Sequence, residues 1–364
     1  MAAALLVLLT VALAFANGAN DVSKGVATLV GAGVTDLRRA LRWGTAWTVA
    51  GGVTAAFAAQ ELVAVFSGKG ILTAPAAGPA LLSAVACGAL GWLLIATRTG
   101  MPVSTTHALV GGLVGAGIAA VGPGGVRWAA VGARTALPLA ASPLLALALI
   151  SAALPLMRVA FRRFNRYCVC LERAEPVVAT TGTALALVPA PSLHVLAGTE
   201  CPPVVVARMN AMDSLHWLSA GFASFARGLN DTPKILALGV ATAAAAGIPV
   251  RWFFALVALA MGAGSYCAGT RVTETLAGKV TRITADEGFG GNLVTSVLVG
   301  LASALALPVS TTHVSSGAIV GVGLHRRDVR WRVVRDMVLA WLVTLPTAGV
   351  IAGVTYAALA RLGD

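Results

Sequence analysis

Charged residues are scarce in this chain. Only 11% of its 364 residues are Asp, Glu, Lys or Arg, whereas 58% are hydrophobic. A soluble chain of this length could not bury so much apolar surface, so the composition excludes an ordinary globular protein and predicts membrane insertion. Among the charged residues, Asp and Glu (14) are fewer than Lys and Arg (26), and the formal net charge is +12. The basic residues lie in short loops between apolar runs and form no known nucleic-acid-reading motif, so we expect no nucleic-acid partner.

Cysteine is also rare, and several catalytic signatures are missing. Five scattered cysteines cannot form a disulfide framework. Cys168, Cys170 and Cys201 lack the paired spacing of zinc sites, so we expect free thiols, no metal and no cofactor. Neither a nucleotide-binding P-loop nor a nucleophile–base pair is evident, and the chain is therefore not expected to be an enzyme. The N-terminus lacks the basic region of a signal peptide and is interpreted as an uncleaved span.

Long apolar runs make up most of the sequence. A helix needs about 20 apolar residues to cross a bilayer, and two sets of five candidates are present. The first member of each set is long and is interrupted by Asn-Asp. The first set is Ala2–Val34, Gly44–Gln60, Gly78–Thr97, Ala108–Val121 and Ala129–Met157, and the second is Met212–Ala246, Trp252–Ala268, Phe289–Leu307, Val314–Leu324 and Met337–Leu362.

Basic residues cluster after the first, fifth, seventh and ninth runs. All four basic loops fall on one side of the bilayer if the N-terminus is outside, which predicts that they are cytoplasmic in the cell (plasma or inner) membrane. We divide the chain into a first membrane repeat at 1–157, a cytoplasmic linker at 158–210 that includes a short hairpin, and a second membrane repeat at 211–364.

Two motifs occur twice in the same order. Phe15–Asp21 (FANGAND) reappears as Phe225–Asp231 (FARGLND), and Pro102–His107 (PVSTTH) reappears unchanged as Pro308–His313. With five spans in each half, the halves have opposite orientations. The predicted fold is therefore an all-α integral membrane protein of two inverted-topology repeats, with broken helices and re-entrant segments.

The Asn-Asp pairs are expensive inside apolar spans, and ionisable groups at membrane depth are candidates for function. Gly18 and Gly228, two residues before each Asn, predict local unwinding that would free backbone groups to hold ions. The alternative is simple ion pairing three residues along a helix. The candidate residues are Asn20, Asp21, Lys24, Asn230, Asp231 and Lys234.

The Pro-Val-Ser-Thr-Thr-His motif is suited to the first turn of a helix, where hydroxyls and free N–H groups can cradle an oxyanion. The alternative role for each hydroxyl is ordinary helix capping. His107 and His313 are expected to orient the loops rather than to contact cargo. The predicted substrate contacts are Ser104, Thr105, Thr106, Ser310, Thr311 and Thr312.

A carboxylate beside an anion is repulsive unless a proton or cation lies between them. Asp21 and Asp231 are therefore candidates for the coupling-ion site as well as for substrate binding. They also favour phosphate over sulfate, because monohydrogen phosphate can donate a hydrogen bond to a carboxylate and sulfate cannot.

The duplicated motifs resemble those of the inorganic phosphate transporter family, and the resemblance covers nearly the whole chain outside the linker. Further matches are Gly269–Thr275, Gly288-Phe289 and Ala340–Pro346. The resemblance implies phosphate uptake driven by sodium or protons, through inverted repeats with a transport part and a scaffold part. Some members of the family carry sulfate instead.

Several positions depart from the family pattern. Lys24 and Lys234 stand where small or neutral residues are usual, and Arg227 stands where many members have His. Thr48 and Asn292 replace glutamates of sodium-using members. Because sodium favours oxygen ligands, these changes predict proton coupling, or lysines acting as fixed cations.

The leading hypothesis is a secondary transporter of inorganic phosphate with a coupling cation, proton or sodium, embedded in the lipid bilayer. The alternative within transport is a permease for sulfate or another oxyanion. A channel or a membrane scaffold is the alternative from a different class, and assembly into a homo-oligomer is left open.

Overall fold

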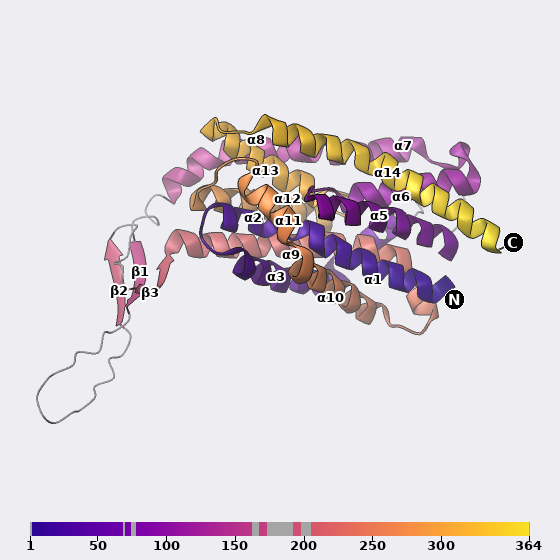
Figure 1. Cartoon of the computed structure of the whole chain (residues 1–364), viewed down its shortest axis with the longest axis horizontal. Coiled ribbons are helices and arrows are strands. Elements are labelled where there is room, and N and C mark those ends of the chain that lie inside the picture. The colour runs from indigo at the N-terminus through magenta and orange to yellow at the C-terminus, as the bar shows by residue number, and fades with distance from the viewer. Residues whose placement is uncertain are drawn as a thin grey trace, which may run out of the picture.

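The computed structural model describes residues 2–67, 70–73, 78–161, 167–172, 192–197 and 205–363. Its helices run side by side as an elongated bundle, with both termini at one end and a small sheet projecting from the other (Figure 1). Exposed apolar side chains are frequent on the outer helices, for example Leu137 on α8 and Leu342 and Val350 on α14. A surface of this kind suits lipid contact and fits a multi-pass membrane protein.

The helices of the first part are α1 (Ala2–Asp21), α2 (Ser23–Gly31), α3 (Leu37–Ala58), α4 (Gln60–Phe66), α5 (Pro79–Thr99) and α6 (Thr105–Val121). They are followed by a 3₁₀ turn (Pro123–Gly125), α7 (Trp128–Val131), a π-helical turn (Gly132–Ala136) and α8 (Leu137–Ala160). The second part contains α9 (Ala211–Ala245), α10 (Val250–Ala268), α11 (Thr270–Gly278), α12 (Ala285–Ala304), α13 (Thr311–Arg326) and α14 (Trp331–Gly363).

Five helical segments in the described residues are long and apolar enough to cross a membrane: Ala3–Gly31, Pro79–Thr99, Leu137–Ala160, Val250–Ala268 and Trp331–Leu362. They coincide with five of the ten predicted apolar runs. The other five runs are also helical, but they form shorter or less apolar helices.

The two predicted helix breaks have different outcomes. α1 ends at Asp21 and α2 begins at Ser23, so the first Asn-Asp does lie at an interruption. Val22 between them keeps helical angles (φ −58°, ψ −31°), so the interruption is slight. The predicted break in the second half is wrong, because α9 continues through Asn230 and Asp231 for 35 residues. Side chains on an intact helix reach the polar partners that unwinding was expected to supply.

The matched positions of Gly18 and Gly228 in the two halves have a packing cause. A Cβ at Gly18 would collide with the carbonyl of Met261 on α10, and one at Gly228 would collide with the carbonyl of Thr48 on α3. Both glycines lie inside helices and allow two backbones to touch. They bring α1 against α10, and α9 against α3, which are pairs of extensively packed helices.

Packing between the helices follows a matched pattern. α1 packs against α5 and α10, while α9 packs against α12 and α3. Likewise α6 packs against α14, and α13 packs against α8. The polar motifs lie where these groups meet, at the start of α6 and α13 and in the middle of the bundle.

The segment between α8 and α9 contains three short antiparallel strands, β1 (Tyr167–Glu172), β2 (Ser192–Ala197) and β3 (Val205–Asn210), in the order β2-β1-β3. The hairpin predicted in the linker corresponds to the β1–β2 pair. Cys168 and Cys170 lie on β1, and Cys201 lies outside the described residues.

Candidate functional site

The two copies of Pro-Val-Ser-Thr-Thr-His fold in the same way. Ser104 precedes α6 and Ser310 precedes α13, with nearly equal backbone angles (φ −100°, ψ 116° and φ −99°, ψ 116°). The Ser104 hydroxyl accepts from the His107 N–H at 3.2 Å, and the Ser310 hydroxyl accepts from the His313 N–H at 3.3 Å. Both serines are therefore N-caps, which was the alternative to direct substrate contact.

Lys24 lies in a cage of oxygen atoms at the end of α1. Its ammonium group forms an ion pair with Asp21 and donates to the Val103 carbonyl at 3.3 Å. The Thr105 hydroxyl also donates to Asp21, at 3.5 Å. All of these side chains are almost completely buried. A buried ammonium ion is tolerated here because a carboxylate and a carbonyl replace its water.

Lys234 lies in an equivalent cage on α9. Its ammonium group donates to the Val309 carbonyl at 2.7 Å, to the Thr106 hydroxyl at 3.1 Å and to Asp231 at 3.5 Å. The Thr311 hydroxyl donates to Asp231 at 3.5 Å. The Asp–Lys ion pairs that were the alternative interpretation are thus both present, and each belongs to a larger polar cluster.

Cross-connections join the two cages. Asn17 donates to Asp21 at 3.1 Å, to the Thr105 hydroxyl at 2.8 Å and to Asp231 at 3.5 Å. The Thr312 hydroxyl of the second motif donates to the carbonyl of Val103 in the first, at 2.7 Å. The reverse bond runs from Thr106 of the first motif to the Val309 carbonyl of the second, at 3.3 Å. Residues about 200 positions apart therefore form one site.

The two asparagines brace the motif loops. Asn20 donates to the Met101 carbonyl at 3.0 Å and accepts from the Val103 N–H at 3.2 Å. Asn230 donates to the Val309 carbonyl at 3.5 Å and to Asp231 at 3.0 Å, and it accepts from the Ser303 hydroxyl at 3.2 Å. They hold the loops whose carbonyls face the lysines.

The histidines lie beside the site. The His107 and His313 rings are 4.6 Å apart, and His313 Nδ1 contacts the Leu139 carbonyl at 2.9 Å. The His313 ring also lies 4.1 Å from that of Trp341. These contacts fix the ring of His313 against α8 and α14, in keeping with an orienting role.

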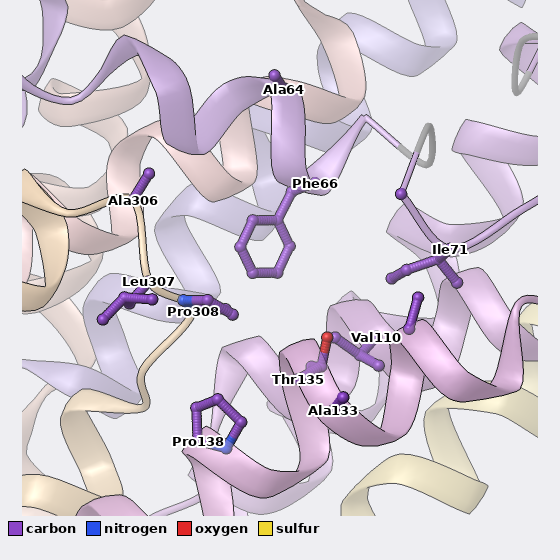
Figure 2. Close-up of a pocket in the computed structure, with 12 residues that line it drawn as sticks. Ala64, Phe66, Ile71, Val110, Ala133, Thr135, Pro138, Ala306, Leu307 and Pro308 are labelled. Carbon is purple, nitrogen blue, oxygen red and sulfur yellow. The ribbon is translucent and has the colours of Figure 1, made fainter.

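A pocket of about 640 Å³ adjoins the second cage. Its wall includes Phe66, Thr135 and Pro308, and Figure 2 shows the Phe66 ring pointing into the space with Pro308 opposite. The ammonium group of Lys234 lies 5.8 Å from the centre of the same ring. Phe66 therefore borders both the pocket and the charged cluster.

All ten predicted substrate residues and both lysines thus lie in one buried polar cluster. Two further residues were not predicted as site residues: Asn17, which bridges both carboxylates, and Arg227, which is 1% exposed. They occupy the same place in the two copies of the first motif, four residues before each Asp. That spacing puts them one helical turn from the carboxylate, a signal available in the sequence.

The departures from the family pattern are also linked in space. Arg227 Nη2 donates to the hydroxyl of Thr48 at 2.9 Å, so two of the unusual residues contact each other. Asn292 donates to the Thr28 hydroxyl at 2.8 Å, and His216 contacts the same hydroxyl at 2.9 Å. At the two positions where sodium-using relatives are expected to carry glutamate, this chain therefore has a hydroxyl that accepts from an arginine and an amide that donates to a hydroxyl.

A model described as the phosphate transporter family matches residues 17–352. The chain belongs to this family. It is 30% identical to the "Putative phosphate permease" of Pyrococcus horikoshii, over 96% of each chain. It is 28% identical to the "Probable low-affinity inorganic phosphate transporter" of Rhizobium meliloti, over 94% of this chain and 92% of the relative.

The same fold occurs in a solved structure described as "The sodium-dependent phosphate transporter". The two chains superpose with a TM-score of 0.78 over 99% of each, at 24% sequence identity. Phosphate transporter family membership and a multi-pass helical membrane fold are therefore established. The coupling ion of this chain is a separate question, because Lys24 and Lys234 lie beside the carboxylates.

Proposed function

We propose that this member of the phosphate transporter family is a secondary transporter that moves inorganic phosphate together with protons and does not need sodium. One observation carries the proposal: the ammonium group of a lysine contacts the oxygen atoms of each cage. Carboxylate, carbonyl and hydroxyl oxygens are the ligands that hard cations prefer. Here Lys24 and Lys234 already bind them.

A fixed cation changes the energetics of the cycle. An ammonium ion tethered to the chain neutralises its carboxylate permanently, whereas a sodium ion must be taken up and released in every cycle. The concentration gradient of sodium can then contribute no free energy. A proton gradient remains available, because inorganic phosphate itself binds and releases protons near neutral pH.

The cluster also favours phosphate over sulfate. Asp21 and Asp231 can accept a hydrogen bond from a protonated phosphate oxygen, and the Thr105 and Thr311 hydroxyls lie against those carboxylates. Sulfate has no proton to donate and would place bare oxygens beside the carboxylates. A sulfate or other oxyanion permease is the competing function, and ion competition separates the two.

We assign the architecture to two inverted repeats at 1–157 and 211–364, joined by the cytoplasmic linker at 158–210. The matched packing supports this assignment, since the contacts of α1 with α5 and α10 correspond to those of α9 with α12 and α3, and the α6–α14 contact corresponds to the α13–α8 contact. The reciprocal bonds from Thr106 and Thr312 follow the same exchange. The assignment places the N-terminus outside and the linker in the cytoplasm, and it requires no catalytic residue.

The test is uptake of radiolabelled phosphate by proteoliposomes under an imposed proton gradient, without sodium and with excess sulfate as competitor. We expect saturable, sulfate-resistant uptake that collapses when the gradient is dissipated. Entry of labelled sulfate instead of phosphate would move the cargo to sulfate. Stimulation by sodium at fixed pH and membrane potential would contradict the fixed-cation argument.

The substitution Lys24→Asn tests the fixed cation directly. It removes the tethered charge and frees the oxygens of Asp21 and Val103. We expect the uptake affinity in sodium-free medium to fall by about tenfold or more, because a charge-assisted contribution of about 1.5–3 kcal/mol is lost. Addition of sodium is expected to restore part of it. Lys279→Asn makes the same change of charge at an exposed lysine outside the cages. It is the matched control and should leave uptake unchanged.

A further inference from the structure

Arg227 is a buried cation that is only partly satisfied by the protein. Its Nη2 atom donates to the Thr48 hydroxyl at 2.9 Å and to the Ser265 hydroxyl at 3.2 Å. Its Nε and Nη1 atoms are buried without any hydrogen-bond partner. An arginine keeps its proton in proteins, and a buried N–H group without a partner is strongly unfavourable. The edge of the guanidinium group formed by Nε and Nη1, here called its free edge, therefore requires an explanation.

The surroundings of Arg227 hold it in place without neutralising it. α3 and α10 contribute only the neutral hydroxyls of Thr48 and Ser265, and no ion pair in the described residues includes Arg227. The charged groups that act on it belong to the two cages, chiefly Asp21 on α1 and Asp231 one turn along α9. The guanidinium is therefore anchored on one edge beside the polar cluster.

A second unpartnered group lies on α1, next to Gly18, whose carbonyl accepts from the same Ser265 hydroxyl that Arg227 contacts. Asn17 occupies the position that matches Arg227 in the first half, and its Oδ1 atom is also buried without a partner. Its amide nitrogen already joins Asp21, Thr105 and Asp231. Free donors on Arg227 and a free acceptor on Asn17 are complementary to an oxyanion that carries both bare and protonated oxygens.

The charge of the cluster limits which anion can bind. Arg227, Lys24 and Lys234 supply three cations, whereas Asp21 and Asp231 supply two carboxylates, so the cluster carries one net positive charge. Glu287, a further buried carboxylate, is neutralised elsewhere by Arg158 and Arg326, at 2.5 Å and 2.9 Å. Since net charge at membrane depth is strongly unfavourable, a single negative charge on the ligand gives the most stable loaded state.

We propose that Arg227 is a substrate-binding and specificity-determining residue whose free edge binds a monovalent oxyanion, dihydrogen phosphate. This inference rests on the proposed function and names the ionic form that is carried. Dihydrogen phosphate brings the cluster to neutrality, whereas the sulfate dianion leaves it with one negative charge. The co-transported proton then crosses the membrane on the phosphate itself, and a separate protein site for it is not needed.

The test measures binding of inorganic phosphate to the purified full-length protein in detergent and sodium-free buffer. The readout is the rise in melting temperature with phosphate concentration. Arg227→Gln removes the charge and keeps a polar side chain. Arg227→Lys keeps the charge but lacks the planar set of N–H donors of the guanidinium group. Thr48→Asp leaves Arg227 in place and gives it a carboxylate partner. Arg251→Gln removes an exposed arginine on α10 and is the matched control.

We expect the apparent Kd for phosphate to rise about 10- to 100-fold in Arg227→Gln and Thr48→Asp, as loss of a charge-assisted hydrogen bond implies. Arg227→Lys should fall between these variants and the wild type, and Arg251→Gln should match the wild type. An anchor that served folding alone would change the melting temperature in the absence of phosphate and leave the phosphate titration unchanged.

The outcomes separate this inference from the proposed function. Wild-type protein that binds phosphate, together with an Arg227→Gln variant that binds it equally well, would overturn the role of Arg227 and leave phosphate transport standing. Equal affinity in Thr48→Asp would overturn the charge argument. Wild-type protein that binds sulfate and not phosphate would overturn the proposed function, and the assignment of dihydrogen phosphate with it.

Discussion

The two halves of the molecule are alike where their sequences are identical and differ where their charges differ. Pro-Val-Ser-Thr-Thr-His adopts the same backbone and the same serine cap in both copies. The Asn-Asp segments diverge, since α1 ends at Asp21 whereas α9 continues well past Asp231. At the position one turn earlier, Asn17 in the first half corresponds to Arg227 in the second.

This comparison shows that a short polar motif can fix local geometry while single substitutions set the electrostatics. Lys24 has two oxygen partners, Asp21 and the Val103 carbonyl, whereas Lys234 has three. The cage in the second half therefore depends less on its carboxylate. The two copies of one motif are expected to respond differently to the same change.

The largest expected effect comes from the carboxylates. Asp21→Asn removes the carboxylate charge that pairs with the buried Lys24 ammonium ion, and breaking a buried ion pair in this way destabilises proteins by about 3–5 kcal/mol. Asp231→Asn should destabilise less, because Lys234 keeps the Val309 carbonyl and the Thr106 hydroxyl. Thermal unfolding of both purified variants measures the difference. A larger loss for Asp231→Asn would contradict the comparison.

Close helix contacts give the next effect. Gly18→Ala and Gly228→Ala force a methyl group onto a neighbouring backbone carbonyl, and overpacking of this kind is expected to destabilise by about 1–3 kcal/mol. Similar losses are expected in both halves, because both contacts are backbone contacts. Gly132→Ala is the control, since the space around Gly132 is open. Equal melting temperatures for Gly18→Ala and Gly132→Ala would rule out the packing role.

The smallest expected effect concerns the serine caps. Ser104→Ala and Ser310→Ala each remove one side-chain acceptor for a helix N–H, which typically destabilises by about 1 kcal/mol. The two losses should be equal, because the caps have the same geometry. Thr at either position should retain the cap. Unequal shifts in melting temperature would mean that one serine has a further role in binding.

Much of the site could be predicted from the sequence because its residues are duplicated and polar within apolar runs. Asn20, Asp21, Thr105 and their counterparts lie in one polar cluster, and both Asp–Lys pairs, which were the alternative interpretation, also form. The break in α9 was predicted wrongly, since glycine and Asn-Asp are compatible with an intact helix when neighbouring loops supply the partners.

Asn17 and Arg227 were missed for a different reason. An asparagine or an arginine near a helix middle has many ordinary roles, and only the distances to other elements identify a particular one. Asn17 is informative because it reaches Thr105 and Asp231, which are distant in sequence. Arg227 is informative because two of its nitrogen atoms find no partner at all.

The sequence alone determined that the chain is a helical membrane protein with a duplicated polar motif, since hydropathy and repetition are properties of residue order. Only the tertiary structure decided which oxygens surround each lysine and that Arg227 has a free edge. These features arise where α1, α3, α9 and α10 meet the two motif loops. Electrostatic interactions depend on distance and burial in space, and residue order does not specify either one.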